Sequence, residues 1–151
     1  MKTILKVLGL GLVFWFARGA FLGKQPTHKG DELMRAVEAG NQSEVVKLLD
    51  AKVDVNSVDH SQNSALYFAA CRGHVAIATL LLDRGANINA VGPSKDTPLH
   101  CAAMLSQKGT AELLINRGAD VNLVSADGYT PLREASDPTI QALLVAKGAH
   151  L

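Results

Sequence analysis

The chain has 151 residues, with 15 Lys and Arg against 14 Asp and Glu, a net charge of +1 at pH 7, and two cysteines. The near-neutral charge argues against a nucleic-acid partner bound by phosphate neutralisation, and two cysteines are too few for a disulfide-stapled miniprotein. With 48% apolar residues, the chain has enough material for the core of one domain.

Residues 1–24 differ in composition from the rest of the chain. They contain four basic residues and no acidic one, which leaves 11 basic and 14 acidic side chains, a net charge of −3, for residues 25–151. The apolar run over residues 7–17 has the length of a secretory signal and is shorter than the roughly 20 residues of a membrane span. We expect residues 1–19 to be a signal peptide cleaved before Ala20, or residues 4–22 to remain as a hydrophobic anchor helix.

These alternatives predict an exported chain, periplasmic or secreted, in which residues 20–30 form a linker. A buried N-terminal helix of a cytosolic protein is the other interpretation of the same apolar run.

From residue 31 onward, one pattern returns at a 33-residue period. Asn56, Asn89 and Asn122 form one register of this pattern. A second register holds leucine, and a third holds alanine three positions later; their members are Leu33, Leu66, Leu99 and Leu132, and Ala36, Ala69, Ala102 and Ala135. Repetition at a fixed period of this length is typical of stacked repeat proteins.

Each unit is predicted to form two short helices joined by a turn. In the second unit, Leu66, Ala69 and Ala70 share one helical face, Gly73 ends that helix, and residues 75–82 form the next helix. Helices this short are not stable alone in water. Each unit must therefore bury its apolar face on the next one, which predicts an all-α solenoid.

The third unit carries the most specific pattern. Residues 97–103 read Thr-Pro-Leu-His-Cys-Ala-Ala, which resembles the T-P-L-H-x-A-A signature of ankyrin repeats, and residues 81–89 and 114–122 are similar to the L-L-x-x-G-A-D-V-N tail of the same family. The resemblance covers residues 31–151, in units 31–63, 64–96, 97–129 and 130–151. It implies an ankyrin-repeat solenoid of four helix-turn-helix units with hairpin-like fingers, preceded by the N-terminal hydrophobic helix.

The third and fourth units depart from this pattern between their helices. Ser106 stands where the inter-helix glycine is usual, and Gly109 comes three residues later, so we expect a different loop there. In the fourth unit, Gly148 comes three residues early, which predicts a shortened loop. Asp137 is expected to cap the last helix, with Pro138 at its first position.

His100, Cys71 and Cys101 are the residues that could carry chemistry. Adjacent helical residues point about 100° apart, so His100 and Cys101 do not face each other as a nucleophile pair would. We expect His100 to bond to its own turn near Thr97 and to the backbone of a neighbouring unit. A thiol- or metal-dependent enzyme that uses His100 and the two cysteines is the hypothesis from another class.

The two cysteines are expected to be free and partly buried. Helices about 10 Å apart, with a three-residue offset between the cysteines, would hold the Cα atoms beyond the roughly 7 Å that a disulfide allows. No catalytic residue, metal site or cofactor is therefore predicted.

The remaining candidates lie at the surface, on the fingers and on the adjoining first helices. Met104 and Leu105 are apolar where polar residues are usual, so they predict either an interface centre with a polar rim or a lengthened helix that buries one of them. The candidate partner-binding residues are His60, Ser61, Asn63, Arg72, Pro93, Ser94, Asp96, Met104, Leu105, Asp127 and Tyr129.

The sequence thus predicts a non-enzymatic module that binds an extracytoplasmic protein through the concave ankyrin surface. A narrower alternative is an inhibitor or protector of an envelope enzyme or toxin. We expect a monomer with no nucleic-acid partner, and a membrane contact only through the N-terminal segment if it is not cleaved.

Overall fold

The computed structural model describes residues 29–151, so the predicted signal peptide or anchor helix lies outside the described residues. The described part is helical and contains no strand, only an isolated bridge between Val58 and Ser64. None of its helices has the length and apolar character that crossing a bilayer requires. The helices are α2 (Lys29–Glu38), α3 (Gln42–Asp50), α4 (Ala65–Arg72), α5 (Val75–Asp83), α6 (Pro98–Met104), α7 (Lys108–Asn116), α8 (Pro131–Glu134) and α9 (Pro138–Ala146).

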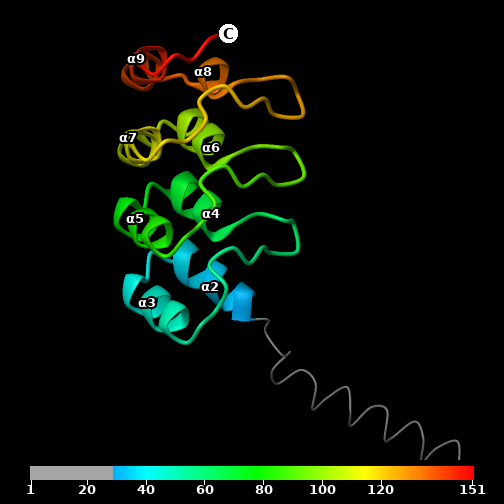
Figure 1. The fold of residues 1–151 in the computed structure, drawn as a ribbon, viewed down its shortest axis with the longest axis vertical. Coiled ribbons are helices and arrows are strands. Elements are labelled where there is room, and N and C mark those ends of the chain that lie inside the picture. Colours follow the sequence, from blue (N-terminus) through cyan, green and yellow to red (C-terminus); the bar gives the residue numbers. More distant parts are fainter. Residues whose placement is uncertain (1–28) are drawn as a thin grey trace, which may run out of the picture.

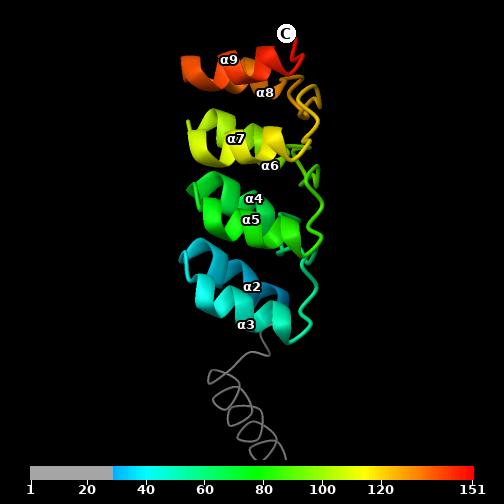
Figure 2. The same cartoon turned by 60° about the vertical axis from the view of Figure 1, so that its left-hand side comes forward.

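The helices form pairs that are stacked in chain order. Figures 1 and 2 show α2, α4, α6 and α8 in one layer, the inner helices, and α3, α5, α7 and α9 in a second, the outer helices. Three hairpin-like connections project on the side of the inner helices (Figure 1). We call them the first finger (residues 57–63), the second finger (90–96) and the third finger (123–129).

A hydroxyl caps the N-terminus of each inner helix from α4 onward. The side chains of Ser64, Thr97 and Thr130 accept the backbone N–H three residues later, in α4, α6 and α8. These residues share one register of the 33-residue period. Each bond satisfies an N–H that the helix itself leaves unpaired, and each is worth about 1 kcal/mol.

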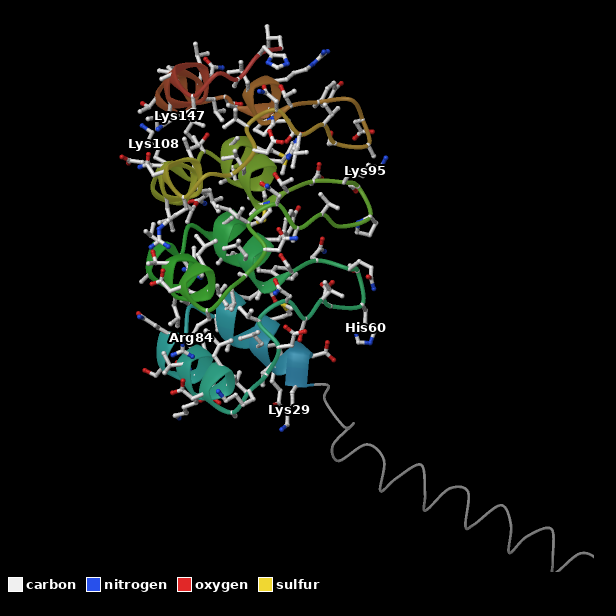
Figure 3. The ribbon with its side chains drawn as sticks, viewed as in Figure 1. Lys29, His60, Arg84, Lys95, Lys108 and Lys147 are labelled. Atoms are coloured by element: carbon white, nitrogen blue, oxygen red, sulfur yellow. A yellow bond between two sulfur atoms is a disulfide. The ribbon has the colours of Figure 1, made fainter. Side chains whose placement is uncertain are left out.

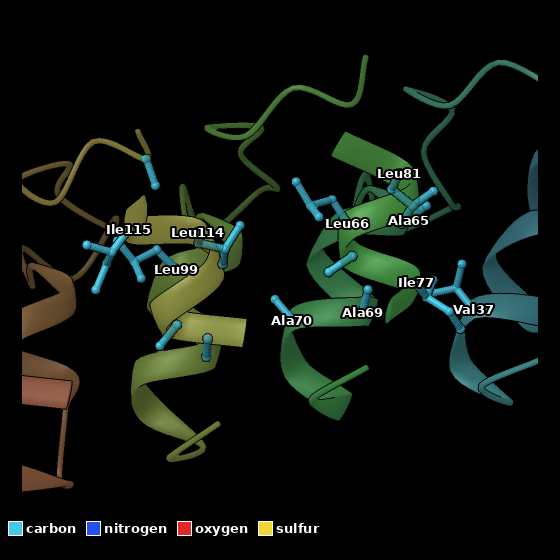
Figure 4. Close-up of a cluster of buried hydrophobic side chains, with 14 of the residues drawn as sticks. Val37, Ala65, Leu66, Ala69, Ala70, Ile77, Leu81, Leu99, Leu114 and Ile115 are labelled. Atoms are coloured by element: carbon cyan, nitrogen blue, oxygen red, sulfur yellow. The ribbon is translucent and has the colours of Figure 1, made fainter. Parts of the chain in front are cut away.

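The core runs the length of the stack without interruption. In the second and third pairs, Leu66, Leu81, Leu99 and Leu114 have no exposed surface. Figure 4 shows these leucines together with Ala65, Ala69 and Ala70 of α4. A fully buried leucine contributes about 1.5–3 kcal/mol. The predicted burial of one apolar face on the next unit is confirmed.

The expectation of a different loop between α6 and α7 is wrong. Ser106 adopts the left-handed conformation (φ 56°) that Gly73 adopts between α4 and α5 (φ 71°). The backbone bonds also correspond: Gln107 N–H reaches Ala102 O at 2.8 Å, as His74 N–H reaches Ala69 O at 2.9 Å. Together with a bond of 3.2 Å from Ser106 N–H to Ala103 O, the Gln107 bond holds Ser106 in a conformation that costs a non-glycine residue about 1–2 kcal/mol.

Gly109 is not a displaced turn residue. It lies in α7, where an added Cβ would come within 2.8 Å of the Val75 side chain. The predicted shortening of the last loop is wrong: residues 135–137 connect α8 to α9, no fewer than connect the earlier pairs, and it is α8 that is short, at four residues. The Asp137 carboxylate accepts N–H groups of Thr139 and Ile140 at the start of α9, as its predicted capping role requires.

Candidate binding surface

The three fingers have the same backbone turn. A residue with positive φ recurs at 33-residue spacing, as Gln62 (63°), Lys95 (57°) and Gly128 (81°). In each finger, the N–H of that residue bonds to the carbonyl three positions before it, at 2.9–3.0 Å. The second and third fingers are joined by a bond of 2.7 Å from Ala126 N–H to Ser94 O. The fingers are therefore held in defined positions by their own backbone.

Every predicted partner-binding residue is at least partly exposed. Asn63 and Asp96 are half-buried at the ends of the first two fingers, and the other nine are exposed. Arg72 forms an ion pair with Glu38 at 3.4 Å, and His60 Nδ1 lies 3.7 Å from the Asp31 carboxylate. The fingers supply His60, Ser61, Asn63, Pro93, Ser94, Asp96, Asp127 and Tyr129, and the inner helices supply Arg72, Met104 and Leu105.

Met104 and Leu105 lie in solvent at the C-terminal end of α6. Their exposed fractions are 50% and 48%, so neither side chain is buried. The helix ends at Met104 with Leu105 as its C-cap, so α6 is not lengthened. Tyr129 is 39% exposed, and its ring lies under the Arg133 guanidinium at 4.5 Å. Tyr129 lies near the N-terminal end of the inner helices, where the fingers begin, whereas Met104 lies at the C-terminal end of α6. The two residues are therefore separated by the length of α6, roughly 10 Å.

His100 bonds to its own turn, as predicted, but its second bond is to the third finger of the same unit (97–129) and not to a neighbouring unit. Thr97 N–H donates to Nδ1 at 3.1 Å, and Nε2–H donates to the Tyr129 carbonyl at 3.1 Å. The ring has no exposed surface, and burial lowers the pKa of His100 despite the opposing effects of the Tyr129 carbonyl and Asp96. This histidine is neutral, and both of its nitrogens are occupied by structural bonds.

The comparisons with known proteins agree with this architecture. A family model described as ankyrin repeats (3 copies) matches residues 33–125, which is more than half of the chain. The chain belongs to the ankyrin-repeat family. The comparison with curated proteins gives no match. Ankyrin repeats are generally protein–protein interaction modules without enzymatic activity.

The expectation of two free thiols in this ankyrin-repeat domain is wrong. Cys71 and Cys101 form a disulfide between α4 and α6, and their Cα atoms are 5.1 Å apart. Cα atoms lie about 2.3 Å from the axis of their helix, so residues that face each other across helices about 10 Å apart can have Cα atoms only about 5–6 Å apart. The bridge joins the inner helices of two adjacent units.

The disulfide occupies the two thiols on which the thiol- or metal-dependent alternative depends. Both sulfurs are bonded to each other, and His100 faces Thr97 and Tyr129 instead of the cysteines. Within residues 29–151, no group of three or more His, Cys, Asp or Glu is placed to hold a metal ion. The structure does not bring the three candidate residues of the enzymatic alternative together in a cavity.

Tyr67 and Glu134 are residues of this surface that the sequence analysis missed. Burial raises the pKa of Tyr67, and the charges of Asp96 and Glu134 raise it further. Burial likewise raises the pKa of Glu134, with Asp96 and Asp127 adding to the effect. The sequence does single out Tyr67, because this residue occupies the position at which the T-P-L-H-x-A-A signature has histidine.

Proposed function

We propose that this ankyrin-repeat chain is an exported, non-enzymatic module that binds an extracytoplasmic protein on the surface formed by the fingers and inner helices. Four repeat units, with α8 and α9 as the last, would present that surface. The exposure of Met104 and Leu105 carries the proposal, because neighbouring exposed apolar side chains on an inner helix favour binding over solubility.

The backbone of this surface supports a binding role. The three fingers share one hydrogen-bonded turn, and the second and third are joined directly. A partner would meet side chains that are already ordered, so little conformational entropy is lost on association. An interface of standard size, roughly 800 Å² per side, is the most that four units would offer.

Export is supported by two independent features. The N-terminal residues have the charge and apolar pattern of a secretory signal. The Cys71–Cys101 disulfide is of the kind that persists in oxidising compartments and is rare in the cytosol.

The test compares Met104→Asp with Val145→Asp in the full chain, tagged at its C-terminus and crosslinked in cells. Val145 is 58% exposed on the outer helix α9 and provides a matched apolar-to-charged control. We expect Met104→Asp to lose the partners that the wild type captures and Val145→Asp to retain them. The free energy of unfolding of both variants should stay within about 0.5 kcal/mol of the wild type, since both changes are at the surface.

Capture of the same partners by Met104→Asp as by the wild type would contradict the proposed surface. Tyr129→Ala tests the finger end of the same surface independently. If only Tyr129→Ala loses partners, the surface is confined to the fingers.

A further inference from the structure

A pocket of about 210 Å³ lies between the first and second fingers. Its walls include Ser61 and Asn63 from the first finger, Pro93 and Asp96 from the second, and Tyr67 from α4. Sites for drug-sized ligands are usually about 300–1,000 Å³. This pocket is therefore sized for a single side chain of a bound protein.

The pocket combines an aromatic wall with a carboxylate. Tyr67 is half-buried and contacts Phe68 edge-on, with the ring centroids 6.0 Å apart. Asp96 is half-buried and forms no ion pair with any described residue. An aromatic ring beside an unpaired carboxylate suits a cation, because the ring face and the carboxylate both attract positive charge.

The surroundings of the pocket reinforce its negative potential. Asp127 and Glu134 also lack ion pairs among residues 29–151. The nearby cations do not line the pocket: Arg133 stacks on Tyr129, and the side chain of Lys95, which stands between the lining residues Ser94 and Asp96, lies at the tip of the second finger (Figure 3). Arg72 is paired with Glu38.

We infer that this pocket receives one basic side chain, Arg or Lys, of the partner protein. The inference rests on the proposed function and names the chemistry that the surface recognises. The aliphatic stem of the basic residue would pack on Pro93 and the Tyr67 ring. Its charged head would meet Asp96, and the hydroxyl and amide groups of Ser61 and Asn63 offer further acceptors.

The test selects peptides from a random linear library displayed on phage, using the full oxidised protein as the target. Synthetic copies of the selected peptides are then measured against wild type and Asp96→Asn. We expect a recurrent Arg or Lys, and a dissociation constant that rises about tenfold or more in Asp96→Asn, as expected for loss of a hydrogen bond between charged groups. Glu112→Gln is the charge-matched control, since Glu112 is exposed on the outer helix α7.

Replacing the basic residue of the peptide separates charge from shape. Citrulline in place of arginine keeps the shape and removes the charge, so it should weaken binding to the wild type about tenfold and have little effect in Asp96→Asn. Exchange of Arg for Lys distinguishes bidentate recognition of Asp96 from a simple charge contact.

The outcomes separate this inference from the proposed function. Selected peptides that lose affinity in Met104→Asp but not in Asp96→Asn, or that lack a basic residue, would overturn the inference and leave the binding surface standing. Peptides indifferent to both substitutions, or a selection that yields none dependent on Asp96, would also overturn it. Indifference to both would count against the binding surface as well.

Discussion

At the scale of the single residue, one position of the repeat shows that the type of side chain determines which contacts a residue makes. Tyr67, His100 and Arg133 recur at the 33-residue period and occupy the third position of α4, α6 and α8. His100 is buried and bonds across to Tyr129, Tyr67 lines the pocket, and Arg133 covers the Tyr129 ring. The shared position could be predicted from the period, but the different contacts depend on side-chain size and charge.

His100 should make the stability of the protein depend on pH. Its Nδ1 accepts Thr97 N–H, so a second proton would break that bond, and burial lowers the pKa of His100. The unfolded chain then binds this proton more readily than the folded one, and stability falls as the pH drops from the usual histidine pKa near 6.5 toward the lowered value. We expect a loss of about 1 kcal/mol in the free energy of unfolding between roughly pH 7 and pH 5.

Urea denaturation of wild type, His100→Gln and His150→Gln across this pH range measures the effect. His100→Gln should be less stable at neutral pH by about 1–3 kcal/mol, but without this part of the pH dependence. His150 is exposed and its side chain forms none of the described hydrogen bonds, so His150→Gln should retain the wild-type slope. Equal slopes in His100→Gln and wild type would contradict the assignment.

At the scale of the helices, the sequence predicts caps better than it predicts loops or close contacts. Asp137 and Pro138 begin α9 as their residue types require. The prediction for Ser106 is wrong because its side chain disfavours a positive φ, yet two backbone hydrogen bonds hold it there. The predicted cysteine distance is wrong because Cα atoms on the facing sides of two helices are closer together than the helix axes are.

The disulfide between α4 and α6 should contribute substantially to stability. It closes a sequence separation of 30 residues, for which the loss of chain entropy in the unfolded state is worth about 3–4 kcal/mol. We expect Cys71→Ala/Cys101→Ala to lower the free energy of unfolding by about 3 kcal/mol, measured by urea denaturation. The wild type treated with dithiothreitol should lose a similar amount, and the double variant should not respond to the reductant. A midpoint that is the same with and without the bridge would contradict this prediction.

At the scale of the whole molecule, neighbouring units are joined by contacts that recur with the repeat. Asn56 accepts Asn87 N–H at 2.8 Å, and Asn89 accepts Asp120 N–H at 3.0 Å, so the asparagine register ties the base of one unit to the next. On the outer helices, Arg84 pairs with Asp50 and Arg117 with Asp83. The period therefore predicts the stack and its direction, because the contacts between units repeat with it.

The candidate surface is less predictable than the stack that carries it. The exposure of Met104 and Leu105 depends on whether α6 ends at its usual length, which the sequence leaves open. The pocket needs Tyr67 from one helix and Asp96 from the next finger, and neither residue fits a motif. Features that repeat can be predicted from the sequence, whereas features formed by exceptions to the repeat require the structure.

Export of the whole chain should be visible in the state of its two thiols. If residues 1–24 direct the chain out of the cytosol, the full chain expressed in bacteria should contain the Cys71–Cys101 disulfide. The cytosol is reducing and disfavours the bond, whereas an exported chain reaches an oxidising compartment in which the bond persists. Leu10→Arg/Leu12→Arg interrupts the apolar run without changing residues 29–151 and should leave both cysteines free. Alkylation with a polyethylene glycol maleimide during cell lysis reports the difference as a shift in gel mobility. A reduced full chain, or a disulfide of equal abundance in the interrupted variant, would count against export and leave the binding surface unaffected.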